Sequence, residues 1–399
     1  MRSLVKFCGA AAAALVLALA PAPAREARAR AVTPGQVVIS EFRFRGPAGS
    51  CDEFVELYNN SVERVVVQST DGSAGWTIAS LDAVGPGEPT VYNDAIMIPN
   101  GTVIPPHGHY LATCVQLDEA NTNRYSLGAY AGPDKKYTLE FNDATGIALF
   151  TTQNFSNFNA STRLDAVGFP GADPLFREGA GLAPAEGITV DVEHSFVRAL
   201  SGGSPKDTGD NASDFVLVAP DPRLIANALA VLGAPGPEST LSPRQHNADI
   251  HVELLNPSQP ATSSPNRVRN TTPVENGRQG TVSLQRRVTN LTGKPLTRLR
   301  FRVVDITTQN SPVVYSQQAD VRVLSSTGVV TRTDGSTVVT VRGLTLEQPP
   351  NQPKGGGLNS TLNLPVKGLP HGASVDVQFL LGVQQGGSFN FAVQVEALP

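Results

Sequence analysis

The sequence predicts an all-β protein with two β-sandwich domains that follow a signal peptide. Gly and Pro are abundant, with 37 and 31 residues, whereas aromatic residues make up only 6% of the chain. Val and Thr recur in short runs between these turn-forming residues. Many turns that separate short β-branched segments are typical of sandwiches and argue against a helical fold. About 370 residues follow the leader, which is enough for two or three domains of ~100–200 residues.

The first 31 residues have the three parts of a secretory signal peptide. Arg2 and Lys6 supply the positive start, residues 7–20 form an apolar run, and small-residue cleavage patterns lead up to Ala31. The run is shorter than the roughly 20 residues that a membrane anchor needs. We therefore expect residues 1–31 to be a signal peptide and short leader, with no transmembrane segment. The expected location is secreted or at the cell surface, extracellular or periplasmic.

The first sandwich is expected over residues 36–222. VVISEFRF at 37–44 and EFVELYN at 53–59 flank a short Gly/Pro segment, which predicts two paired strands. Turn sequences such as Asp-Gly and Pro-Asn-Gly separate the later strands. We expect those strands at residues 65–68, 75–79, 102–104, 110–115, 137–141, 146–151, 164–168 and 194–198.

Residues 223–247 are expected to be a linker, because GAPGPESTLSPRQ at 233–245 has little to bury. Residues 248–399 are then expected to form a second sandwich. About eight strands in roughly 150 residues fit an immunoglobulin- or fibronectin-like domain. The strands are expected at 249–255, 280–289, 296–304, 320–325, 337–341, 360–366, 375–383 and 388–397, with long polar loops at 260–276 and 347–357.

Two cysteines, Cys51 and Cys114, remain after the leader. An isolated pair in an oxidising compartment is usually a disulfide, and we predict one here. Two separately buried thiols are the competing interpretation.

Ordered motifs in the first half match a known pattern. They are ISE (39–41), ELYN (56–59), GWTI (75–78), IPPHGHYL (104–111), LDAVGF (164–169), SFVR (195–198) and DF (214–215). Together they resemble the lamin-tail immunoglobulin-like domain over roughly residues 36–222, with long insertions at 83–93 and 169–191. The resemblance implies a compact sandwich, a surface or adaptor role in exported proteins, and no catalytic residues. The second half resembles a generic immunoglobulin-like domain, through NLTG (290–293) and LRFRV (299–303).

Two groups of residues raise the question of catalysis or metal binding. Asp52, Glu53 and Glu56 share one short segment, but strand alternation places Glu53 and Glu56 on opposite faces. We expect Glu56 to be a structural hydrogen-bonding residue. His107 and His109 flank one turn, yet the sequence points to no third metal ligand, so an exposed turn is expected. Nucleophile and nucleotide-binding motifs are missing, and we expect no enzyme, no catalytic residues, no cofactor and no metal.

The second half carries one pattern that suggests anion binding. Arg298, Arg300 and Arg302 alternate with apolar residues and therefore share one sheet face. Arg287 joins them if its strand pairs with theirs. A row of guanidinium groups binds phosphate, sulfate or uronate, and the alternative is a solvated face that protects the sheet against edge pairing. Nucleic acid is disfavoured as a partner, because Phe301 is expected to face inward.

The two halves differ in charge. Residues 32–222 hold 10 Lys+Arg against 24 Asp+Glu, and residues 223–399 hold 16 against 10. The halves therefore attract each other, or the second half faces an anionic partner.

Three functions follow from the sequence. The first is an exported, non-catalytic surface or extracellular binding or structural module, whose partner is a cell-envelope component, a polysaccharide or another surface protein. The second is an accessory protein that binds anionic polysaccharide through the Arg face. The third is a metal-dependent hydrolase around Asp52, Glu56 and the turn of His107 and His109.

Overall fold

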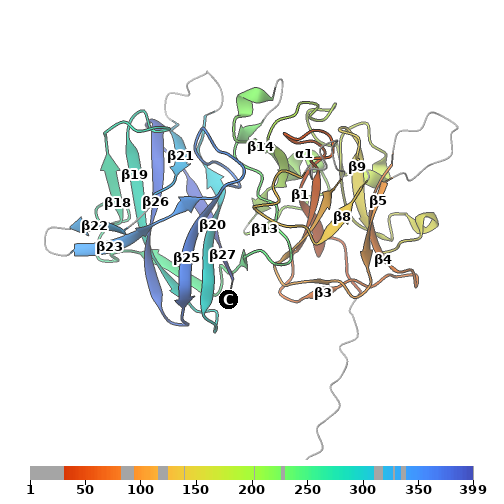
Figure 1. The fold of residues 1–399 in the computed structure, drawn as a ribbon, viewed down its shortest axis with the longest axis horizontal. Coiled ribbons are helices and arrows are strands. Elements are labelled where there is room, and N and C mark those ends of the chain that lie inside the picture. Colours follow the sequence, from red (N-terminus) through yellow and green to blue (C-terminus); the bar gives the residue numbers. More distant parts are fainter. Residues whose placement is uncertain are drawn as a thin grey trace, which may run out of the picture. The chain divides into compact units, whose positions relative to one another are not determined.

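Strands make up nearly all of the regular structure in the computed structural model of the chain (Figure 1). The structure describes residues 31–81, 94–115, 125–138, 140–201, 203–225, 230–309, 318–326, 329–333 and 338–398. Helical segments among them are single turns: η1 (Phe155–Asn157), η2 (Pro174–Phe176), α1 (Asn211–Asp214) and η3 (Pro222–Leu224). The predicted all-β fold class is confirmed. None of the described helices is long and apolar enough to cross a membrane.

Two expectations fall outside the described residues. They are the signal peptide, except for its last residue, and the insertion at 83–93.

The first half of the chain forms two main sheets. The seven-stranded sheet has the order β15-β14-β11-β1-β2-β7-β8, and the four-stranded sheet has the order β10-β9-β4-β5. The strands are β1 (Val37–Arg43), β2 (Phe54–Asn59), β4 (Gly75–Ser80), β5 (Asp94–Pro99), β7 (His109–Cys114), β8 (Lys135–Tyr137), β9 (Gly146–Phe150), β10 (Arg163–Gly168), β11 (Ser195–Arg198), β14 (Phe215–Ala219) and β15 (Val231–Leu232). Two short pairs accompany them: β3 (Val65–Val66) with β6 (Val103–Ile104), and β12 (Leu200–Ser201) with β13 (Ser204–Pro205).

The predicted pairing of the first two strands is confirmed. β1 and β2 run antiparallel, with Val38 opposite Tyr58. The core beneath them holds Phe42, which stacks on Phe196 at 5.3 Å between ring centroids. Trp76 is buried in the same core, and its indole N–H donates to the carbonyl of Gln68 at 2.9 Å. The polar edge of this large ring is thereby satisfied while its apolar surface stays buried.

The second half forms two further sheets. One has the order β16-β27-β20-β25-β24; the other has the order β17-β19-β26-β23-β22, with β18 paired to β19 and β21 to β26. The strands are β16 (Arg244–Gln245), β17 (Ile250–Leu254), β18 (Arg267–Asn270), β19 (Thr281–Asn290), β20 (Leu296–Ile306), β21 (Asp320–Leu324), β22 (Val329–Thr333), β23 (Val338–Gly343), β24 (Thr345–Leu346), β25 (Thr361–Leu369), β26 (Ser374–Gln385) and β27 (Phe391–Leu398). Figure 1 shows β20, β25 and β27 side by side, as their pairing requires. Phe301 is buried in the core between the sheets, as predicted, and contacts Phe379.

The segment expected to be a long polar loop at 260–276 contains a strand. β17 pairs with residues 286–290 of β19, and β18 pairs with residues 281–284 of the same strand. β18 therefore continues the sheet edge that β17 begins. An edge strand exposes much of its surface, so its sequence, RVRN, lacks the apolar alternation that marks a strand.

Each described sheet takes its strands from only one half of the chain, residues 37–232 or residues 244–398. Residues 31–399 nevertheless cluster as one compact unit. A parallel bridge between Gly233 and Leu358 connects the two sets of sheets. The division into domains at 36–222 and 248–399 stays a prediction.

Candidate functional site

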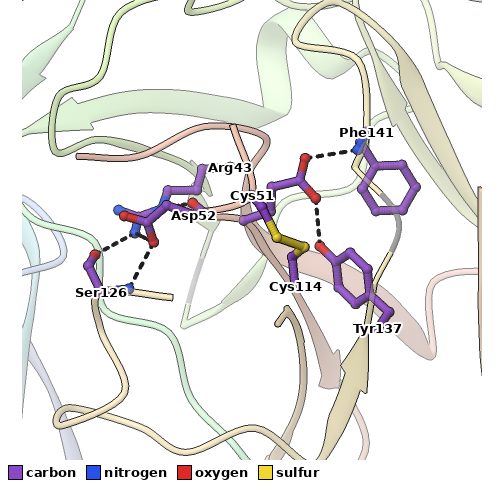
Figure 2. Close-up of a disulfide and its surroundings, with 8 residues drawn as sticks. Arg43, Cys51, Asp52, Cys114, Ser126, Tyr137 and Phe141 are labelled. Atoms are coloured by element: carbon purple, nitrogen blue, oxygen red, sulfur yellow. Dashed lines mark hydrogen bonds and ion pairs between the residues drawn. A yellow bond between two sulfur atoms is a disulfide. The ribbon is translucent and has the colours of Figure 1, made fainter. Parts of the chain in front are cut away.

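Cys51 and Cys114 form the predicted disulfide (Figure 2). Their Cα atoms lie 5.6 Å apart, and 63 positions of sequence separate them. Both residues are buried. Figure 2 shows Arg43 and Asp52 on one side of the bond and Tyr137 on the other. The disulfide therefore lies inside a buried polar network that joins several loops.

The neighbouring carboxylates hold this network together. Asp52 pairs with the buried guanidinium of Arg43 and accepts the backbone N–H of Ser126 at 2.9 Å. Glu53 accepts the backbone N–H of Phe141 at 2.8 Å. Both carboxylates thus anchor loop backbone. Of the two carboxylates in the hydrolase hypothesis, Asp52 pairs with Arg43, whereas Glu56 lies beside His109. Glu53 and Glu56 contact different groups, as strand alternation predicts.

Buried His194 next to this network gives the fold a dependence on pH. Its Nδ1 hydrogen bonds to the carbonyl of Val192 at 2.9 Å. Burial, together with the charge of Arg43, lowers the pKa of His194 to about 4, whereas an unfolded histidine titrates near ~6.5. A lowered folded-state pKa stabilises the fold above pH ~6.5, and this contribution is lost as the pH falls towards 4.

We expect His194→Asn to remove this dependence, because the amide keeps a donor but carries no titrating group. Between pH 7 and 4.5 the wild type is expected to lose about 2 kcal/mol of unfolding free energy more than the variant. Urea unfolding of both proteins at the two pH values measures the difference. Equal losses would show that His194 is protonated without cost in the fold.

A second charged network contains the arginines of the predicted anion-binding face. Arg300 and Arg302 are buried, with 2% and 8% of their surface exposed. Their Nε atoms lie 2.6 and 2.7 Å from the two carboxylate oxygens of Glu396 on β27. Glu238 pairs with both guanidinium groups from the opposite side. The expectation of a solvated Arg face is therefore wrong for these two residues, because carboxylates of the chain itself neutralise them.

The other two arginines lie elsewhere. Arg298 pairs with Glu347, and its side chain is 35% exposed. Arg287 lies in the other sheet, since β19 pairs with β26 and not with β20, and its Nε is 2.9 Å from Asp376. The structure therefore does not gather the four predicted anion-binding residues into one row.

The middle of the predicted linker is buried rather than exposed. Residues 232–239 are all buried, including Glu238 at 1% exposure. Two of its positions need glycine because neighbouring atoms leave no room for a side chain. A Cβ on Gly233 would lie 2.3 Å from the carbonyl oxygen of Leu358, and one on Gly236 would lie 2.5 Å from Nη1 of Arg302. The Gly/Pro composition that suggested a flexible connector instead permits tight packing between the two sets of sheets.

Carboxylates from the first half hold the same segment. Glu41 accepts the backbone N–H of Gly236 at 3.0 Å and the hydroxyl of Ser195 at 2.6 Å. Glu56 accepts the backbone N–H of Glu238, which confirms its expected hydrogen-bonding role. Burial and the nearby charge of Glu56 raise the pKa of Glu41 to about 7. This part of the structure is therefore rich in buried negative charge.

The side chains of the two histidines in the turn contact different groups. His107 faces Tyr58, whose hydroxyl lies 3.1 Å from Nδ1. His109 is 9% exposed; its Nδ1 lies 2.9 Å from Oε1 of Glu56 and its Nε2 lies 2.9 Å from Oε2 of Glu238. The expectation that this turn is exposed is wrong for His109.

A cleft of about 430 Å³ opens beside this cluster. Glu56, His109 and Glu238 line it together with Tyr58. Much of its remaining wall is aliphatic and comes from both halves of the chain, and Arg198, Arg302 and Asp305 also line it. The aliphatic lining includes Val197, Leu200, Val216, Val231, Val304 and Ile306. This mixture of an apolar wall and a few convergent polar groups is the usual character of a small-molecule site.

Sequence reasoning missed the residues that complete the cluster. Glu238 lies in the predicted linker and Glu396 in the last strand, 129 and 287 positions from His109. One signal was present: Glu238 is the only charged residue within residues 224–243. No family model, curated protein or solved structure matches the chain.

Proposed function

We propose that the protein is an exported, non-catalytic binding module whose ligand occupies the cleft between its two halves. The cleft itself carries this proposal, because strands β11, β14 and β15 of the first half and β20 of the second half all contribute to its wall. Its aliphatic walls favour binding, since apolar surface contributes affinity but no reactive group. The ligand is a component of the cell envelope or of the extracellular surroundings.

The finer assignments belong to the same proposal. We take the leader of residues 1–31 to direct export, and the disulfide fits an oxidising compartment. We also assign residues 36–222 to a lamin-tail-like domain, a choice that the sandwich-like sheets of this region support. A surface or adaptor role is then expected from that resemblance.

The buried charges support a fixed geometry for the cleft. The segment at 232–239 is held by Glu41 and Glu56 from one side and by Arg302 from the other. A cleft formed by two rigidly joined halves is preorganised, so less ordering entropy opposes binding.

Filling the cleft tests the proposal. The side chain of Val216 is half-buried and lines the wall, so Val216→Trp is expected to occupy much of the space. The wild type is expected to be retained on immobilised cell-envelope material or on one polysaccharide of a neutral and anionic panel. We expect Val216→Trp to weaken that retention by about tenfold or more, equivalent to ~1.4 kcal/mol.

Val252→Trp is the matched control, because Val252 is 41% exposed on β17 and does not line the cleft. This variant should bind like the wild type. Wild-type protein that is retained on none of these materials, or binding that is unchanged in Val216→Trp, would exclude the cleft as the site for such ligands.

A further inference from the structure

The cluster that borders the cleft has an excess of buried negative charge. Glu41, Glu56, Glu238 and Glu396 are four carboxylates, each at most 3% exposed, and Arg300 and Arg302 are the two guanidinium groups among them. Before His109 is counted, the carboxylates exceed the guanidinium groups by two when Glu41 is ionised and by one when Glu41 is protonated, as its raised pKa of about 7 allows. Arg298 and Glu347 lie nearby but balance each other. Uncompensated buried charge is costly, so this arrangement favours an additional cation.

Three side chains of the cluster hold donor atoms close to one another. One donor atom each from Glu56, His109 and Glu238 lies within 4.8 Å of the other two. In a tetrahedral zinc site with bonds of about 2.0 Å, donor atoms are roughly 3.3 Å apart. Nδ1 of His109 lies 2.9 Å from Oε1 of Glu56, which is close to that value, whereas Oε2 of Glu238 lies 2.9 Å from the other ring nitrogen, Nε2. A single ion takes one of the two ring nitrogens, so an ion bound at Nδ1 requires the carboxylate of Glu238 to rotate towards it.

The competing arrangement is an imidazolium held between two carboxylates. In that case both ring N–H groups should donate hydrogen bonds. Nδ1 of His109 is buried and makes no hydrogen bond, although Oε1 of Glu56 is 2.9 Å away. The ring is therefore badly aligned for a hydrogen bond to each carboxylate, and Nδ1 remains available as a metal ligand.

The surrounding contacts resemble an outer shell that orients metal ligands. The hydroxyl of Ser40 donates to Glu56, and Nη2 of Arg302 lies 2.9 Å from Oε2 of Glu238. The hydrogen bond from Ser40 helps to fix the orientation of the Glu56 carboxylate, as outer-shell contacts of metal ligands do, and the ion pair with Arg302 holds Glu238 by charge. Glu56, His109 and Glu238 also line the cleft, so a fourth coordination position faces it.

We propose that Glu56, His109 and Glu238 form a binding site for a divalent transition-metal ion of the zinc class, with its fourth position open to the cleft. One imidazole and two carboxylates are a donor set typical of Zn²⁺. Ca²⁺ and Mg²⁺ prefer six or more oxygen ligands and water and are not expected to compete. The inference goes beyond the proposed function, because ion binding is measured without a cleft ligand.

Titration of the metal-free full chain with Zn²⁺, followed by calorimetry, tests the site. We expect one Zn²⁺ per chain, a higher unfolding temperature with Zn²⁺, and no saturable binding of Ca²⁺ or Mg²⁺. Loss of an outer-shell contact typically weakens a metal site by ~10–100-fold. Loss of the ligand itself in His109→Asn is therefore expected to weaken Zn²⁺ binding by about 100-fold or more.

His107→Asn is the matched control, since His107 lies in the same turn and tolerates Asn at its positive φ of 48°. It should keep wild-type affinity for Zn²⁺. Glu56→Gln provides a second ligand variant in case His109→Asn does not fold, and Co²⁺ absorption in the wild type reports a tetrahedral site directly. Absence of Zn²⁺ binding at micromolar concentration, or equal affinity in the wild type, His109→Asn and Glu56→Gln, overturns the proposal. An equal loss of affinity in His107→Asn also overturns it.

Discussion

Replacing Glu396 with Ala is expected to destabilise the protein by about 3 kcal/mol, the lower end of the range for breaking a buried ion pair, because two buried guanidinium groups lose one of the two carboxylates that they share and keep only Glu238. Glu396 is 1% exposed, and its two oxygens accept from Arg300 and Arg302 at 2.6 and 2.7 Å. Neither arginine can reach water to recover the lost interaction, since both are buried. Urea unfolding of the variant and the wild type measures the loss.

Two further variants separate charge from packing. Glu396→Gln keeps the shape of the side chain and one acceptor oxygen, so its loss should be smaller than that of Glu396→Ala. Glu253→Ala removes a partly exposed carboxylate from β17, and surface changes of this kind usually cost less than ~0.5 kcal/mol. If Glu396→Ala lost no more than Glu253→Ala, the buried pairs would not contribute to stability.

The all-β fold was predictable because its signals are local. Alternating runs such as residues 37–44 and 53–59 mark strands with one face towards the core, and the structure pairs them as β1 and β2. β18 was missed because an edge strand buries too little to show alternation. Turn residues located most strand boundaries to within a few positions, since those residues adopt backbone conformations that other residues avoid.

The site was only partly predictable, because its parts come from distant segments. Alternation correctly placed Arg300 and Arg302 on one face, but it says nothing about what covers that face. Glu238 covers it, from a segment whose Gly and Pro residues look like a flexible linker. Composition cannot distinguish a glycine that gives flexibility from one that allows close packing, as Gly236 does against Arg302.

The histidine turn shows the same limit. The hydrolase hypothesis placed Asp52 and Glu56 with the turn of His107 and His109. The structure brings Glu56 to His109 but adds Glu238, which nothing in the sequence indicated. Their meeting depends on the pairing of β2 with β7 and on the path of residues 232–239. Such long-range contacts follow from tertiary packing and leave no local pattern.

Removing the disulfide is expected to cost about 4 kcal/mol of unfolding free energy, because Cys51 and Cys114 close a long loop. The chain-entropy relation gives this magnitude for the observed separation of 63. Cys51→Ala with Cys114→Ala avoids placing hydroxyl groups at these two buried positions. The comparison is urea unfolding of the double variant against the wild type, each with and without reductant.

The measurements with reductant identify the origin of the lost unfolding free energy. Reductant should lower the stability of the wild type to about that of the double variant and leave the double variant unchanged. The constraint acts on the unfolded chain, so the native spectrum of the double variant should match that of the wild type. A changed native spectrum would instead show that the bond positions the adjoining network of Arg43 and Asp52, and that the folded state carries part of the effect.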